Sequence, residues 1–280
     1  MDKITHTEPV MCKYCGAFDS VKYGTFEGMQ RHFCKICRRK FADNDALPRM
    51  KTPVWVISSV LHYYYDGMSI GAIQKQINQQ HGAYYAQSSI YNWVMRFSKQ
   101  AIEQVKSFHP RVGNSWLVCE TILNIGNRRL WFWDIFDIGS KYLLVSRLSE
   151  FGTVKEISAL MESAYLKAGK LPEQITTTMP MSNFEIIHKI KDEQITRLIS
   201  IEKDRSNATD LFHSILKKRN RIMHGFNSIA TIQILTDTWL IHYNFIAGDN
   251  RTQVPPAQKT DEPSFKSWAD LINPISSRKI

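Results

Sequence analysis

The chain has 280 residues, of which 43% are hydrophobic and 22% charged, a balance that excludes both a membrane protein and a disordered chain. Its formal net charge of +10 favours a polyanionic partner, with nucleic acid first, because positive potential concentrates phosphates and their binding releases counterions. The charge alone is equally compatible with a basic protein that has no such partner. The length predicts two or three domains.

Targeting and membrane signals are not expected. The start, MDKITHTEPVM, has no apolar run, and the most apolar stretch, VWVISSVLHYYY, is too short and too polar to cross a bilayer. The five cysteines form two close pairs and one lone residue, unlike the disulfide framework of a secreted protein. These features predict a cytoplasmic protein.

The two cysteine pairs predict a zinc ribbon over residues 1–48. A two-residue gap lets one tight turn present both thiolates to an ion, and two such turns complete a tetrahedral sulfur shell. Such a site has no open position, so the zinc is structural. Between the pairs we expect two short strands around a turn at Glu27 and Gly28. The alternative is four reduced cysteines without metal. The ligands are Cys12, Cys15, Cys34 and Cys37.

A basic cluster surrounds the second cysteine pair and suits phosphate contact, although a solvated charged rim is an ordinary alternative. The cluster consists of Lys35, Arg38, Arg39 and Lys40.

Residues 49–108 predict a helix-turn-helix DNA-binding domain. The first helix starts near Pro53 and closes at Gly67, and Ser69 caps a second helix that ends near Gly82. Ser88 or Ser89 opens the third helix, which is expected to enter the major groove. A plain helical bundle fits the periodicity as well, but the neighbouring zinc ribbon favours DNA. The polar side of the third helix carries Gln87, Ser88, Ser89, Tyr91, Asn92 and Arg96.

Residues 109–280 predict a mixed α/β sheet. Three apolar segments, 115–125, 128–138 and 141–149, alternate with turn signals and predict an antiparallel meander. The pattern then alternates between helix and strand, an order that is typical of the ribonuclease H-like fold. The later predicted elements are a helix over 153–168, a strand at QITTT, a helix over 184–190, a strand at RLISI, and a helix over 208–223.

Several stretches of this domain carry a resemblance. WLVCET resembles a first strand in which Asp-Glu-Thr is usual, ITTTMP resembles Thr-Asp-Gly-Leu-Pro, and NATDLFH resembles Asn-x-x-Glu-Arg-x-His. With the zinc ribbon and helix-turn-helix in front, the chain resembles the DDE transposases of bacterial and archaeal insertion sequences over nearly its whole length. WFWDIFD, KKRNRIMHGFNS, WLIHYNF and the late VPPA resemble further signatures of that family.

The resemblance implies three carboxylates that hold two Mg²⁺ or Mn²⁺ ions for DNA cleavage and strand transfer. It places them at Cys119, Thr177 and Asp210. A thiol is a soft ligand, threonine has only a hydroxyl, and aspartate is one carbon shorter than the expected glutamate. We therefore expect a protein that binds DNA and has lost catalysis, with Cys119 acting as a small buried hydrophobe.

An active transposase with a rearranged site stays the alternative. Its carboxylates would be Glu120, Asp137 and Asp210, with Asp134 as a further candidate. Glu120 can join such a site only if the strand slips by one residue, because successive strand residues point to opposite faces.

The resemblance also implies partners. Duplex DNA with a transposon-end-like sequence would lie against the basic helix after Asp210, and the protein would act as a homodimer or larger assembly. The helix supplies His213, Lys217, Lys218, Arg219 and Arg221. A final helix over SFKSWADLI is expected to pack its apolar side chains on the domain.

Overall fold

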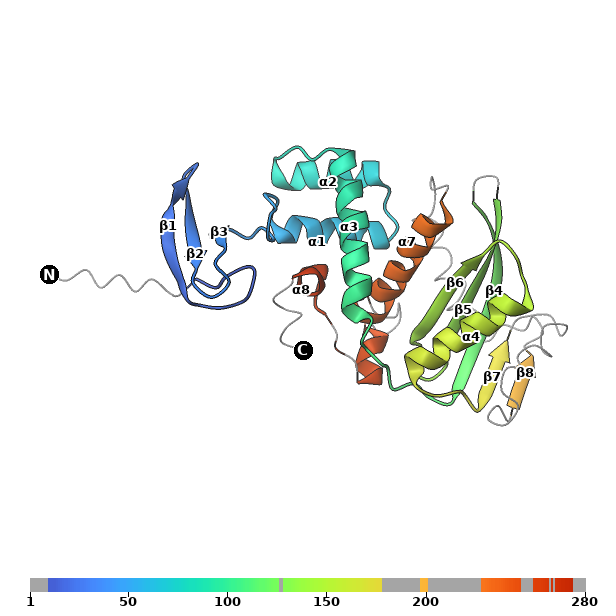
Figure 1. The fold of residues 1–280 in the computed structure, drawn as a ribbon. Coiled ribbons are helices and arrows are strands. Elements are labelled where there is room, and N and C mark those ends of the chain that lie inside the picture. Colours follow the sequence, from blue (N-terminus) through green and yellow to red (C-terminus); the bar gives the residue numbers. More distant parts are fainter. Residues whose placement is uncertain are drawn as a thin grey trace. The chain divides into compact units, whose positions relative to one another are not determined.

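The computed structural model describes residues 10–125, 128–177, 197–200, 228–247, 254–261, 263 and 265–273 (Figure 1). The chain divides into two compact units, the first made of residues 1–60 and 267–280 and the second of residues 61–266. The predicted division into three domains, at 48/49 and 108/109, stays a prediction. Among the described residues, none of the helices combines the length and the apolar character that a bilayer crossing requires, and the cytoplasmic location also stays a prediction.

The first unit begins with a small antiparallel sheet of three strands, β1 (Ser20–Phe26), β2 (Met29–Cys34) and β3 (Lys40–Ala42). The predicted turn joins β1 to β2: Glu27 and Gly28 both have positive φ, 49° and 77°, as the tight turns of twisted hairpins require. The third strand was not predicted, because three residues carry too little alternation to be recognised.

Three helices follow in the chain, close to where they were predicted: α1 (Val54–Tyr65), α2 (Ile70–His81) and α3 (Gln87–Val105). The boundary between the two units lies within α1, so α2 and α3 belong to the second unit. Ser69 caps α2 as expected, since its hydroxyl accepts from the Ala72 amide at 3.2 Å, and Gly82 ends α2 in the left-handed conformation. The predicted start of α3 was wrong by one or two residues. Ala86 is its N-cap, without a side-chain bond, so Ser88 and Ser89 lie inside the helix.

The second unit contains a five-stranded mixed sheet, which confirms the predicted α/β class. Its order is β6-β5-β4-β7-β8, with the meander β4-β5-β6 antiparallel and β7 and β8 added parallel to β4. The interior strand β5 is buried on both faces from Phe132 to Asp137, as its continuous apolar sequence indicates. The strands are β4 (Ser115–Ile125), β5 (Arg128–Asp137), β6 (Leu143–Ser149), β7 (Gln174–Thr177) and β8 (Arg197–Ser200).

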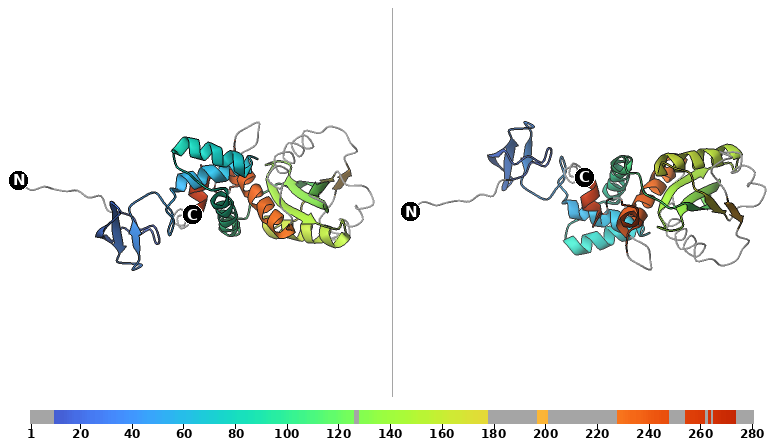
Figure 2. Two further views of the ribbon diagram at one scale, coloured as in Figure 1. Left: turned by 90° about the horizontal axis from the view of Figure 1, so that it is seen from above. Right: turned by 90° about the horizontal axis from the view of Figure 1, so that it is seen from below.

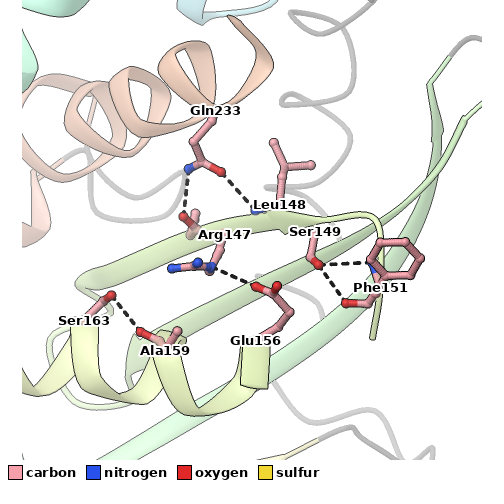
Figure 3. A network of polar contacts seen from close by, with 9 residues as sticks. Arg147, Leu148, Ser149, Phe151, Glu156, Ala159, Ser163 and Gln233 are labelled. Atoms are coloured by element: carbon pink, nitrogen blue, oxygen red, sulfur yellow. Dashed lines mark hydrogen bonds and ion pairs between the residues drawn. The ribbon is translucent and has the colours of Figure 1, made fainter. Parts of the chain in front are cut away.

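Helix α4 (Val154–Ala168), which connects β6 to β7, runs along one face of the sheet (Figure 2). It buries a helical stripe of Ile157, Leu160, Met161 and Ala164. At its start, Glu156 accepts from the Arg147 guanidinium of β6 at 3.2 Å (Figure 3). That contact fixes which face of the meander α4 covers: the face of Arg147 and, in register with it, Trp133.

Helix α7 (Ile229–His242) continues into a π-helical turn (Tyr243–Ala247) and protects the outer edge of β6. The Gln233 amide accepts from the Leu148 N–H at 3.0 Å and donates to the Ser146 carbonyl at 3.1 Å (Figure 3). The Asn244 amide likewise accepts from the Leu143 N–H at 3.0 Å and donates to the Leu143 carbonyl at 2.8 Å. These two side-chain amides bind backbone groups of β6 that a neighbouring strand would otherwise bind. The edge of the sheet therefore offers fewer free backbone groups to another chain.

The C-terminal part contains a 3-10 turn (Pro256–Thr260) and the predicted final helix, α8 (Trp268–Ile272). Trp268 and Leu271 are buried as expected, but α8 belongs to the first unit, where the Ala269 N–H donates to the Ser58 hydroxyl of α1 at 3.1 Å. The expected packing of α8 on the domain of residues 109–280 was therefore wrong. Ser267 and Asp270 form a capping box at the start of α8. The helices predicted over 184–190 and 208–223 lie outside the described residues.

Candidate functional site

The four paired cysteines form a cluster that fits zinc. Their sulfur atoms all lie within 4.8 Å of one another, and the Cys12–Cys37 and Cys15–Cys34 sulfur pairs are each 3.6 Å apart. A tetrahedron with Zn–S bonds of about 2.3 Å has edges of about 3.8 Å. The cluster therefore matches a closed four-sulfur shell, as the spacing predicted.

Tight backbone turns set this geometry. After the first pair, Gly16 has a φ of 78° and donates its N–H to the Cys12 carbonyl at 2.9 Å, which closes the turn. In the second turn the Cys34 N–H donates to the Arg39 carbonyl at 3.0 Å. Cys12 and Cys34 are buried with Phe41, and these three residues form the centre of a very small core.

Without a cation the cluster is electrostatically unfavourable. Burial raises the pKa of the Cys12 thiol to about 12, whereas the backbone N–H of Cys37 lowers the pKa of Cys34 to about 7. The environment therefore pushes the pKa values of the two thiols in opposite directions. A divalent ion allows all four to be thiolates, which is the form that binds zinc.

The ribbon surface joins basic and aromatic side chains. The Lys40 ammonium lies 3.9 Å from the centre of the Tyr23 ring and donates to its hydroxyl at 2.6 Å, and the Arg39 guanidinium lies 5.0 Å from the Tyr14 ring. All four predicted basic residues are exposed, although Lys35 pairs with Asp19 at 3.3 Å. Tyr23 and Phe26 are 48% and 61% exposed. In sequence these two residues indicate only a strand, although exposed aromatics beside lysine also suit base stacking.

On α3 the predicted polar side is only partly exposed. Asn92 and Arg96 are exposed, whereas Ser89 and Tyr91 are half-buried. The Arg96 guanidinium lies 5.3 Å from the ring of the buried Phe97, so its stem rests on the helix surface and its charged end stays accessible. The exposed part of the predicted polar side is thus Gln87, Ser88, Asn92 and Arg96.

Cys119 and Thr177 lie on neighbouring parallel strands but on opposite faces of the sheet. Both are fully buried. The register pairs Thr177 with Val118, so its side chain shares the face of Val118 and Glu120 and points away from that of Cys119. The two positions therefore do not converge, and Asp210 lies outside the described residues, as do the predicted DNA-binding residues His213, Lys217, Lys218, Arg219 and Arg221.

Glu120 and Asp137, two members of the alternative rearranged site, lie apart along the meander. Asp137 pairs with Trp116, four residues along β4 from Glu120, which separates them by about 13 Å at about 3.3 Å per residue. The Asp137 carboxylate instead holds a turn. It accepts from the Gly113 N–H at 2.9 Å, the Ser140 N–H at 2.7 Å and the Ser140 hydroxyl at 2.5 Å.

Replacing Asp137 with alanine is expected to destabilise the sheet rather than affect metal binding. The change removes the acceptor of three hydrogen bonds at a residue that is 1% exposed, and the Ser140 donors are buried. A loss of about 1–3 kcal/mol in the free energy of unfolding follows from leaving such donors unsatisfied. Urea unfolding of the variant measures it. An unchanged midpoint would show that water replaces the carboxylate.

Asp134 lies directly opposite Cys119 in the sheet. The two residues both have 0% exposure, and in such a pair the Cβ atoms are about 5 Å apart. Asp134 also accepts from the hydroxyl of Ser146, its neighbour on β6. The second strand therefore contributes a buried carboxylate to the face of Cys119.

Comparison with known proteins gives weak structural likenesses only. No protein-family model and no curated protein matches the chain. A chain in the cryo-EM structure of the simian T-cell lymphotropic virus intasome in complex with PP2A regulatory subunit B56 gamma is similar at 14% identity and a TM-score of 0.42, over 74% of this chain and 75% of that one.

Two structures of the HTLV-2 integrase catalytic core domain in complex with magnesium are also similar. The trimeric form has 14% identity and a TM-score of 0.41, over 54% of this chain and 99% of that one. The dimeric form has 13% identity and a TM-score of 0.35, over 49% and 88%.

Proposed function

We propose that this chain is a DNA-binding protein derived from a DDE transposase, with DNA cleavage and strand transfer lost. The observation that carries the proposal is the pair of buried, uncharged side chains, Cys119 and Thr177, on opposite faces of β4 and β7. Magnesium is held by hard anionic oxygens, so a thiol and a hydroxyl on two faces cannot form the clamp. The strand order of the sheet supports a ribonuclease H-like ancestry.

DNA binding does not depend on those positions. It needs positive charge and correct placement, because phosphate contacts position a protein while contacts to base edges specify the sequence. The exposed basic and aromatic side chains of the ribbon and the exposed Asn92 and Arg96 of α3 supply both kinds of contact. The partner is duplex DNA of transposon-end type, bound by a homodimer or larger assembly, and the ribbon contains structural zinc.

The test is binding of the full chain to labelled duplexes at several salt concentrations, followed by incubation with Mg²⁺ or Mn²⁺. Affinity is expected to fall with salt, by a slope of about −0.9 in log–log form for each phosphate contacted. The bound DNA is expected to stay intact in the presence of either metal. Binding that is absent at low salt, or independent of salt, would overturn the DNA-binding function.

Changing Arg96 to alanine is expected to weaken specific binding by about 1–3 kcal/mol, while binding to unrelated DNA changes less. Arg96 is exposed on the predicted recognition helix, where its loss removes a base-edge contact. Lys106→Ala is the matched control, because Lys106 is 74% exposed just beyond α3 and the change removes the same charge. Equal effects of the two variants on all duplexes would contradict the groove assignment.

The second candidate is an active transposase in which Asp134 replaces the missing carboxylate of β4. The register of Asp134 with Cys119 favours Asp134 over Asp137 and Glu120 for that role. Metal-dependent cleavage of a terminal inverted repeat would then be abolished by Asp134→Asn and by Asp210→Ala. Cleavage by the natural chain would overturn the loss of catalysis, and the two variants identify its ligands.

A further inference from the structure

A second cluster of metal-ligand side chains lies in the unit of residues 61–266, and the proposed function does not use it. It consists of His62, in the last turn of α1, Asp66, just after α1, and His242, the last residue of α7. The ligand atoms of the three side chains all lie within 4.8 Å of one another. Residues 180 positions apart in the sequence thus converge on one point.

The geometry points to a transition-metal site, and we propose that these three side chains bind a divalent ion such as Zn²⁺. The Asp66 carboxylate offers a different oxygen to each imidazole: Oδ2 lies 3.2 Å from His62 Nε2, and Oδ1 lies 3.2 Å from His242 Nε2. Ligand atoms about 2.0–2.1 Å from a tetrahedral zinc are about 3.3 Å apart. Each imidazole nitrogen lies at about this separation from one carboxylate oxygen, although the two oxygens differ, so an ion would bind one of them or both together.

The protein environment favours this set of donors. His242 is 2% exposed, which holds its ring in place, whereas His62 and Asp66 are 48% and 39% exposed and leave a path for an ion from solvent. The two imidazole rings are 5.5 Å apart between centroids and inclined at 70°, so they approach edge to face instead of stacking. Two imidazoles and one carboxylate suit zinc, cobalt or iron(II).

The bound ion would have only three protein ligands. In contrast to the closed thiolate cluster of the ribbon, this site leaves at least one position for water or an anionic oxygen. The ion would also link the C-terminal end of α1 to the C-terminal end of α7.

A simpler explanation is that Asp66 accepts hydrogen bonds from two neutral imidazoles, with no metal involved. Both explanations fit the distances, but they differ in stoichiometry. A metal site predicts a second zinc per chain beside the ribbon zinc. Hydrogen bonds alone predict one zinc only.

The experiment is a calorimetric titration of the untagged full chain, prepared with one zinc per chain so that the thiolate cluster is filled. One further equivalent of Zn²⁺ is expected to bind and to raise the midpoint of thermal unfolding. His62→Ala and Asp66→Asn should each abolish both effects. Both side chains are partly exposed, so the variants are expected to fold, and unchanged circular dichroism in zinc-free buffer checks this.

His109→Ala is the matched control, because His109 is an exposed histidine of the same unit, and it should bind the second zinc as the natural chain does. The proposal is overturned if the natural chain binds no second equivalent, or if His62→Ala and Asp66→Asn still bind it. No DNA is present in this titration, so its result is independent of the proposed DNA-binding function.

Discussion

Replacing Cys34 with serine is expected to unfold the ribbon and remove one zinc per chain. The ribbon's small core centres on Cys12, Cys34 and Phe41, with the buried His32 stacked on Phe41, so the metal has to supply most of the stability. Structural zinc contributes an apparent 10–16 kcal/mol or so in small fingers, and that energy depends on all four ligands. Hydrogen exchange over β1, β2 and β3 and metal analysis measure the two effects.

The matched control is Ile36→Ser, which places the same serine within the second cysteine turn at a residue that is 65% exposed. It should keep the zinc and the slow exchange of the ribbon. The sheet of residues 61–266 is expected to unfold at an unchanged temperature in both variants, because it belongs to the other compact unit. A Cys34→Ser chain that keeps slow exchange in β2 would show that the ribbon is stable without metal.

If the ribbon contacts phosphates, Cys34→Ser also lowers the salt dependence of DNA binding, since Arg39 and Lys40 lose their fixed positions. The zinc would then affect DNA binding indirectly, by keeping the basic surface of the ribbon folded. Arg39 rests on Tyr14 and Lys40 on Tyr23, and both rings belong to the folded ribbon.

The features that the sequence predicted correctly are local. The spacing of the cysteines fixes their cluster, Glu27 and Gly28 supply the positive φ of the hairpin, and Ser69 and Gly82 cap α2. Each depends on residues a few positions apart. The order of strands and helix from β4 to β7 was also recoverable, because alternation of strand and helix periodicity is itself local.

What the sequence could not provide are contacts between distant segments. Nothing near Asn244 indicates that its amide binds Leu143, 101 residues away, and the motif WLIHYNF was interpreted by resemblance alone. The faces of β4 also depend on register, which no short stretch determines. For this reason the contacts of Asp137 with its own turn were not foreseen, and the convergence of His62 with His242 was missed.

Cys119→Asp is expected to lower the free energy of unfolding by about 3–5 kcal/mol at neutral pH without metal, the scale of an uncompensated buried charge. Cys119 is 0% exposed and faces Asp134, so the new carboxylate enters a buried site that already contains one. Cys119→Asn is the matched control, because asparagine has nearly the same shape and no charge. The difference between the two variants in urea unfolding isolates the electrostatic cost.

The pH dependence has a definite sign. Burial beside a like charge raises the pKa of the new carboxyl in the folded protein above its unfolded value of about 3.9. The deficit of the aspartate variant relative to the asparagine variant should therefore be absent below about pH 4 and grow as the pH rises toward the folded-state pKa. An aspartate variant as stable as the asparagine one at pH 7 would mean that water reaches this face, against a role for Cys119 as a buried hydrophobe.

Adding Mn²⁺ to the same two variants tests whether the sheet can still hold a metal ion between positions 119 and 134. If the fold still places two facing carboxylates as a clamp, the ion offsets their repulsion, and stability returns in the aspartate variant but not in the asparagine one. Recovery would mean that the proposed loss of catalysis comes from the missing carboxylate at position 119, and that the space for a metal ion is still present. If Mn²⁺ has no effect, the packing around Cys119 has closed over the site, and restoring one carboxylate cannot restore an enzyme.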